Sequence, residues 1–343
     1  MSLFGRKDPL LSFDMFDLQR SADEAKRYNK CENIYHKGQH MAWNGKEVLE
    51  MLVAKHGLPQ MDAQTRAALQ RIFAIILWGE LAAWRISAQL ADRLVPLEAK
   101  MAATSQVHDE ARHFYVMYDY LQLLGDVPKE LDFAPRKLLE MVLRTDNLAY
   151  KLLGMQLMVE TLALTIFQAV RLAKPEPILA ELMTYYERDE ARHVGLGMQF
   201  LPVLLKDMNK RQMAGFFAFQ ARILALGIWE TKVIEGDLNA LGIDPREVME
   251  RGRAKQMVVL NKTFETLGLN PEKGIVIGLF SSVGEVLFPA PELVGDRIGQ
   301  VKSAVRAIRG DLPEVLEDEM TVHETHDIVT ALDSRARKDK RAN

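Results

Sequence analysis

Two copies of one pentapeptide, Asp-Glu-Ala-Arg-His, are the part of this chain best suited to chemistry; they occur at 109–113 and 189–193. A single glutamate stands thirty residues before the glutamate of each copy. Positions i and i+3 share one face of a helix, so each Glu-x-x-His offers an oxygen and a nitrogen to one ion. Four glutamates and two histidines in this order are typical of a two-metal carboxylate site in a four-helix bundle. The predicted ligands are Glu80, Glu110, His113, Glu160, Glu190 and His193.

The charge and setting of these glutamates favour a metal. Glu80 lies in IILWGELAAW and Glu160 in LMVETLAL, which are strongly apolar segments. Four buried carboxylates without cations would cost several kcal/mol each, and two divalent ions balance their charge. One such glutamate alone could equally be a protonated core acid, but the set of six favours a dinuclear centre.

The remaining charged residues of each pentapeptide have a role beside the ligands. A ligating histidine usually donates its second ring N–H to a carboxylate. We expect each aspartate to contact the histidine of the other copy and to pair with an arginine; solvated pairs on the surface are the alternative. The four residues expected to surround the ligands in this way are Asp109, Arg112, Asp189 and Arg192.

Residues one helical turn from the ligands are expected to line a mostly apolar substrate cavity with one or two polar groups. Gly197 would leave room for substrate there, although close helix packing is the alternative reading of this glycine. Glu230 and Glu235 are expected to be surface or structural residues of a later helix. The expected cavity residues are Trp84, Gln106, Met117, Gln156, Leu164, Tyr186 and Gly197.

Four long helices must position the ligands, and strand signals are nearly absent. Asp62 is suited to cap the first helix, which should stop near Pro96. A second should cover 97–124, a third 136–173 with a break near Asp146-Asn147, and a fourth 178–206.

The rest of the chain is expected to support this bundle. Residues 1–45 look irregular and precede a short helix at 46–56, and together they belong to an N-terminal segment that spans 1–61. The bundle core spans 62–206, the accessory helices of the same domain 207–310 and a polar tail 311–343. The accessory helices are predicted at 209–241, 245–268, 274–287 and 292–309.

Composition excludes several classes of protein. The 343 residues include 48% hydrophobic ones and carry a net charge of −3 without a basic stripe, so nucleic acid is not an expected partner. Cys31 is the one cysteine, which excludes an intrachain disulfide. The apolar windows 72–79 and 215–229 are short of a membrane span of about 20 residues. We expect a cytoplasmic protein without an integral membrane segment.

The order Glu…Asp-Glu-x-Arg-His…Glu…Asp-Glu-x-Arg-His resembles the ferritin-like di-iron carboxylate oxidases and oxygenases over residues 62–206. It is similar to bacterial multicomponent monooxygenase hydroxylases, acyl-carrier-protein desaturases and ribonucleotide reductase small-subunit-like oxidases. The resemblance implies an all-α, ferritin-like four-helix bundle with additional packed helices. It also implies two iron ions (Fe2+/Fe3+) or a mixed Mn/Fe pair, with O2 as co-substrate. One ion would take Glu80, Glu110 and His113, the other Glu160, Glu190 and His193, with Glu110 and Glu190 able to bridge.

Two positions depart from relatives in that superfamily. Met117 stands where ribonucleotide reductase small subunits usually carry a radical tyrosine, which disfavours a radical-generating subunit. Tyr186 stands where arylamine N-oxygenases carry an additional histidine ligand. The chain also continues far beyond the four helices of a simple ferritin.

The function expected from the sequence is a non-haem di-iron oxidase or oxygenase. It would hydroxylate, desaturate or otherwise oxidise an apolar or aromatic organic molecule, with electrons from a ferredoxin or a reductase. A homodimer is expected by analogy alone. The alternatives are a Mn/Fe ligand-binding oxidase, a radical-generating subunit, a ferroxidase or iron-handling protein without organic substrate, and a metal-stabilised scaffold.

Overall fold

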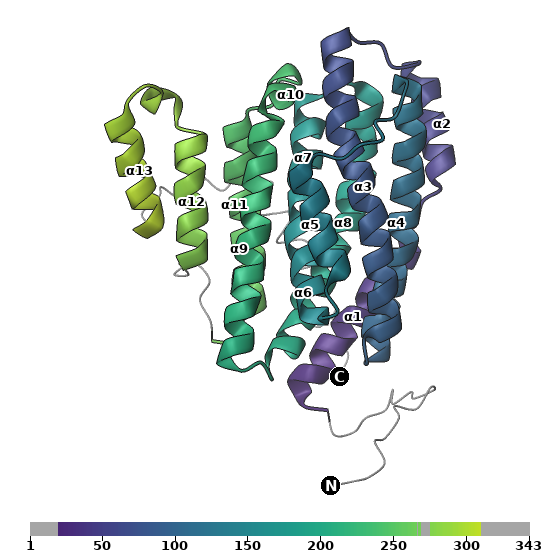
Figure 1. The fold of residues 1–343 in the computed structure, drawn as a ribbon. Helices are drawn as coiled ribbons and strands as arrows, with labels where there is room; N and C mark the ends of the chain where they lie inside the picture. Colours follow the sequence, from purple (N-terminus) through teal and green to yellow (C-terminus); the bar gives the residue numbers. More distant parts are fainter. Residues whose placement is uncertain (1–19, 266, 269–274, 310–343) are drawn as a thin grey trace, which may run out of the picture.

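The computed structural model describes residues 20–265, 267–268 and 275–309, and every regular element in this part of the chain is a helix (Figure 1). This confirms the all-α class predicted from the sequence. The predicted tail 311–343 lies outside the described residues.

The first helix pair agrees closely with the predicted bounds. Helix α3 spans Ala63–Arg93, and the Asp62 carboxylate accepts a hydrogen bond from the Thr65 N–H at 2.9 Å. Helix α4 spans Leu97–Leu124 and packs along α3. It ends at Gly125, whose φ of 124° is a conformation that glycine tolerates and other residues rarely adopt.

The predicted third helix is divided, as expected, near Asn147. Helix α5 (Phe133–Arg144) ends before this residue, and the Asn147 side chain then caps α6 (Leu148–Leu152) by accepting backbone N–H bonds. Helix α6 continues into a π-helical segment, η1, at Leu153–Val159, which was not predicted from the sequence. Such segments are rare and often lie at functional sites.

The π-helical segment leads directly into α7 (Glu160–Ala173), so Glu160 is the first residue after the wider turns. Helix α8 (Pro177–Leu205) then runs back along α7 and also packs against α4. The α3–α4 and α7–α8 pairs therefore bring the ligand-bearing segments together in the interior of a helical bundle (Figure 1).

The prediction that residues 1–45 are irregular is wrong for α1, which spans Ala22–His40. A capping box between Ser21 and Glu24 starts this helix. Only a narrow apolar stripe, which includes Cys31 and Ile34, enters the core, so the polar sequence concealed the helix. Helix α1 packs against α4 and α8, and α2 (Gly45–His56) packs against the same two helices.

The later helices pack around the second pair, as the sequence predicted in outline. The predicted helix at 209–241 is interrupted at Ile234 and forms α9 and α10. Helix α9 packs against α5, and α11 packs against α7 and α8. The bounds are α9 Lys210–Val233, α10 Glu235–Ala240, α11 Pro245–Glu265, α12 Ile275–Leu287, the 3-10 turn η3 Pro291–Leu293 and α13 Arg297–Arg309.

By length and composition alone, two helices in the described part of the chain could cross a membrane, Ala63–Arg93 and Leu148–Ala173. Half of the apolar window of the first and 72% of that of the second are buried inside the molecule. Core helices of globular proteins have the same properties, so this feature is weak support for a membrane-spanning segment.

Candidate metal centre

All six predicted ligand side chains meet in the interior, between α3, α4, α7 and α8, and all six are buried. They form two groups of four, and within each group one nitrogen or oxygen atom from every residue lies within 4.8 Å of the others. Glu110 and Glu190 belong to both groups, so each is placed to bridge two cations. The groups are Glu80, Glu110, His113 and Glu190, and Glu110, Glu160, Glu190 and His193.

Each histidine directs Nδ1 toward the carboxylates. His113 Nδ1 lies 3.0 Å from Glu190 Oε1 and 3.4 Å from Glu80 Oε2. His193 Nδ1 lies 2.9 Å from Glu190 Oε2 and 3.1 Å from Glu110 Oε1. The two imidazoles therefore present the same nitrogen to the same cluster of oxygens, which is the arrangement a dinuclear centre requires.

The opposite ring nitrogen of each histidine faces an aspartate from the other helix. His113 Nε2 lies 3.2 Å from Asp189 Oδ2, and His193 Nε2 lies 3.4 Å from Asp109 Oδ2. The crossed contacts expected from the sequence are thus present. An aspartate that accepts a hydrogen bond from Nε2–H fixes the tautomer in which Nδ1 has a free lone pair for a cation.

Both aspartates are also joined by two arginines. Arg112 Nη2 donates to Asp109 Oδ1 at 2.5 Å and to Asp189 Oδ2 at 2.8 Å. Arg192 Nη2 donates to Asp109 Oδ2 and to Asp189 Oδ1, each at 2.8 Å. The four residues form a closed, charge-balanced network that links α4 to α8 and holds both histidine partners in place.

Trp43 completes this network and was not found from the sequence. Its indole Nε1–H donates to Asp189 Oδ2 at 2.6 Å, and the Arg112 guanidinium lies 4.8 Å from the centre of its ring. Trp43 lies between α1 and α2, where neither spacing nor periodicity marks it. Only the packing of the N-terminal helices onto α4 and α8 brings it to the site.

The donor set fits a pair of divalent cations. Three of its atoms are buried and have no hydrogen-bond partner: Glu110 Oε2, His113 Nδ1 and Glu190 Oε1. Such atoms are costly unless a cation or proton satisfies them. Carboxylate and imidazole groups suit iron and manganese.

The titration behaviour of the metal-free cluster agrees with this fit. Burial raises the pKa of Glu80 and of Glu160 well above the usual range, and neighbouring carboxylates raise it further. Burial lowers the pKa of His113, but the neighbouring carboxylates of Asp189, Glu190 and Glu80 outweigh this effect and raise it well above normal. Without metal the cluster therefore holds protons to offset its negative charge, and bound cations would displace them.

Three of the seven residues expected to line a cavity instead support the proposed ligands. Gln106 Nε2 donates to Glu110 Oε1 at 3.0 Å and to Glu160 Oε1 at 3.1 Å, and Gln156 donates to Gln106. Tyr186 stacks on the His113 ring at 4.3 Å and donates its hydroxyl proton to the His113 carbonyl oxygen at 2.6 Å. These side chains fill the space beside the cluster.

The other expected cavity residues lie in packed surroundings. Met117 is fully buried in the core, Leu164 packs against core residues, and Trp84 contacts the rings of Phe114 and Tyr115. A Cβ atom added to Gly197 would lie 2.6 Å from Leu157 Cδ2 and 2.9 Å from Gln156 Cβ. Gly197 therefore serves close helix packing against η1.

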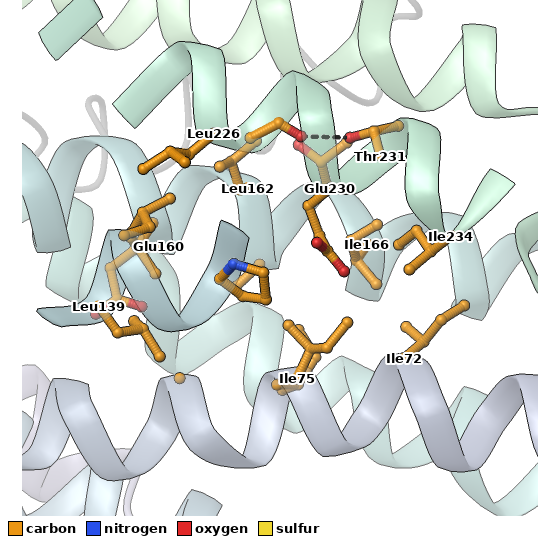
Figure 2. A pocket seen from close by; sticks show the side chains of 18 of the residues that line it. Ile72, Ile75, Leu139, Glu160, Leu162, Ile166, Leu226, Glu230, Thr231 and Ile234 are labelled. Atoms are coloured by element: carbon orange, nitrogen blue, oxygen red, sulfur yellow. Dashed lines mark hydrogen bonds between the residues drawn. The ribbon is translucent and has the colours of Figure 1, made fainter. Parts of the chain in front are cut away.

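A cavity does adjoin the cluster, but on the side of Glu80 and Glu160 (Figure 2). Its volume is about 150 Å³, and its wall is mostly aliphatic. None of the seven expected residues lines it, because they lie on the sides of the ligand helices that other side chains fill. Residues from α3, α5, α7 and α9 form the wall, among them Ile75, Leu139, Ile166 and Leu226.

Glu230 is the second functional candidate that the sequence did not identify. It was expected on the surface or in a structural role, yet it is only 9% exposed and lines this cavity. A single acidic residue in a mainly apolar helix gives no sign of which way it faces. Its position becomes evident only when α9 is placed against α5 and α3.

Comparison of the chain with protein-family models finds no match, and comparison with curated proteins finds none either.

Proposed function

We propose that this protein is a ferritin-like, non-haem di-iron oxidase or oxygenase that uses O2 to oxidise a small organic molecule. The observation that carries the proposal is the pair of buried four-residue groups that share Glu110 and Glu190. Shared carboxylates hold two ions close together, which is the arrangement that dinuclear carboxylate proteins use. Two iron(II) ions held by these residues would supply two electrons for the reduction of O2 beside an organic molecule, and an external donor such as a ferredoxin or a reductase would restore them.

The protein groups around the ions have distinct roles in this proposal. Glu80 and Glu160 each complete one group at the boundary with the cavity. His113 and His193 would hold the ions through Nδ1, while Asp189 and Asp109 lie beside the opposite ring nitrogens. Tight packing on the remaining sides excludes water, which limits side reactions and strengthens electrostatic interactions in the site.

The apolar cavity supports an organic substrate over iron handling alone. A mostly aliphatic wall beside Glu80 and Glu160 suits a hydrocarbon group, whereas a ferroxidase needs a hydrated path for iron. The donor set accommodates iron or manganese, so metal analysis of the protein as purified from its own host, before any loading, tests for a mixed Mn/Fe centre.

The decisive experiment is anaerobic loading with Fe(II) and then exposure to O2. We expect two iron ions per chain by metal analysis, O2 uptake at an electrode and a transient visible absorption band. Glu110→Ala should lose both iron binding and O2 uptake, whereas Asp119→Asn, on the exposed face of the same helix, should retain them.

Two results would count against the proposal. Iron that binds and is then lost to a mineral, without a defined two-ion product, would favour iron handling. Failure of carefully loaded protein to retain more than one ion per chain would exclude a dinuclear centre.

A further inference from the structure

The Glu230 carboxyl group is an unusual feature of the cavity wall. Neither of its oxygens accepts a hydrogen bond from a donor in the described structure, although the side chain is nine-tenths buried. Figure 2 shows it directed into the cavity. The hydroxyl of Thr231, by contrast, donates to the Gly227 carbonyl oxygen, and that of Thr165 donates to the Thr161 carbonyl oxygen. Glu230 is therefore the polar group of the wall, apart from the proposed ligands, that still lacks a donor.

The charges around Glu230 favour a cation as the missing partner. Asp132 is its charged neighbour, and burial together with this carboxylate raises the pKa of Glu230 to about 7. Arg71 is the nearby cation, but its Nη2 and Nη1 atoms already donate to Asp132 and Asp237, each at 3.0 Å. When Glu230 is protonated it can donate to Asp132; when it is ionised it faces a carboxylate and has no donor.

The size of the cavity limits the occupant. A volume of about 150 Å³ is well below the roughly 300–1,000 Å³ of sites for drug-sized ligands. It matches the volume, about 150 Å³, of an engineered apolar protein cavity that binds benzene. One ring or a short branched chain therefore fits this volume.

Different polar groups line different parts of the cavity wall. Ile75 and Glu80 both line it and are five residues apart on α3, which corresponds to a rise of about 7.5 Å. Figure 2 shows Glu230 facing the part of the wall formed by Ile75 and Ile166, whereas Glu160 lies at another part of the wall. Glu80 lines the cavity too and belongs with Glu160 to the proposed metal centre. A molecule with one ring and a two-carbon arm spans this interval.

We propose that the cavity selects a compact apolar molecule with one basic amine, whose ammonium group binds Glu230 while its apolar part lies toward Glu80 and Glu160. The occupant is a substrate only if the proposed oxygen chemistry is correct, but its binding requires neither iron nor O2. A charge-assisted hydrogen bond to a buried carboxylate would supply most of the selectivity. An anionic molecule of the same shape would be repelled by the carboxylates of Glu230 and Asp132 and would not bind.

The test compares three probes of matched shape, 2-phenylethylamine, ethylbenzene and phenylacetate, by calorimetric titration of the full-length, metal-free protein at pH 8. At this pH the Glu230 carboxyl group is largely ionised. We expect the amine to bind at least about tenfold more tightly than ethylbenzene and phenylacetate not to bind, given the usual strength of hydrogen bonds to charged groups.

Variants locate the interaction. Glu230→Gln should remove the preference for the amine but leave ethylbenzene binding unchanged. Glu235→Gln is the matched control, since this carboxylate pairs with Lys232 at 2.7 Å and does not line the cavity. Gly79→Leu should abolish binding of every probe, because Gly79 lines the cavity and a Cβ atom there meets nothing within 4 Å.

The comparison of probes on the unmodified protein needs no variant, so a folding defect cannot obscure the result. Equal binding of amine and hydrocarbon, absence of any binding, or an unchanged preference in folded Glu230→Gln would each overturn the inference. If iron-loaded protein consumes O2 while no probe binds, the proposed function stands and this inference fails. If the amine binds but no dinuclear centre forms, this inference stands and the proposed function fails.

Discussion

His113 Nε2 lies 3.2 Å from Asp189 Oδ2, so the imidazole on α4 is oriented by a carboxylate on α8. Asp109 has the same relationship to His193 in the opposite direction. Because each pentapeptide orients the histidine of the other, substitution of the aspartate in one pentapeptide should weaken metal binding by the histidine of the other pentapeptide.

We therefore expect Asp189→Asn to lower the affinity for Fe(II) by about 10- to 100-fold, through loss of the fixed orientation of His113. Asp109→Asn should have a similar effect through His193. Anaerobic metal titration measures both, and exposed Asp119→Asn on α4 is the control. An affinity unchanged from the unmodified protein would show that the contacts do not orient the ligands.

The shared glutamates should differ from the unshared ones in how many ions they control. Glu80 belongs to one group and Glu110 to both. Glu80→Ala should leave one ion per chain, whereas Glu110→Ala should leave less than one, because neither group then retains its four ligands. Metal analysis after gel filtration measures this difference. Equal loss in the two variants would contradict the assignment of Glu110 as a bridge.

Glu230 should make the stability of the metal-free protein depend on pH. Its pKa rises from 4.5 to about 7 on folding because of burial and the Asp132 carboxylate, whereas Arg71 opposes the rise. The protonated form of Glu230 is the one that folding favours. Its contribution to the free energy of unfolding is therefore full below pH 4.5 and is lost as the pH rises through 7.

Glu230→Gln should remove that dependence. The free energy of unfolding of the variant, relative to the unmodified protein, should increase between about pH 5 and 7 and then level off. Urea denaturation at several pH values measures it, with Glu235→Gln as the control. If the stability of Glu230→Gln and of the unmodified protein varied with pH in parallel, the pKa of Glu230 would not be raised on folding.

Two helical glycines should respond oppositely to alanine. Gly197→Ala places Cβ 2.9 Å from Gln156 Cβ, so we expect a loss of about 1–3 kcal/mol in the free energy of unfolding. Gly79→Ala meets nothing within 4 Å and should gain about 0.5–1 kcal/mol from reduced backbone entropy of the unfolded chain. Thermal and urea unfolding compare them directly. A neutral Gly197→Ala would mean that α8 and η1 separate easily.

Local signals in the sequence were sufficient for the helices that carry the ligands. Asp62 caps α3, Gly125 ends α4 and Asn147 caps α6, and each acts on backbone groups within a few residues. The spacing of Glu110 and His113 places both on one helix face without reference to any other segment. The clustered residues and the bounds of α3, α4 and α8 could therefore be predicted closely.

Contacts between distant segments could not be predicted in the same way. Trp43 reaches Asp189 across 146 residues, and the stripe of α1 that includes Cys31 is too narrow to mark a helix by periodicity. The π-helical turns before Glu160 likewise have no sequence signature here. These features depend on which helix faces meet.

The sequence by itself determined which glutamates and histidines form the buried cluster, because residue type and helical spacing are properties of short segments. The tertiary structure decided which side of the centre is open. The side near Gly197 is closed by Leu157, and the side near Glu80 stays open because α5 and α9 leave a cavity there. Whether a helix face is filled or empty depends on packing between segments far apart in the chain, and this is why Glu230 emerged only from the folded structure.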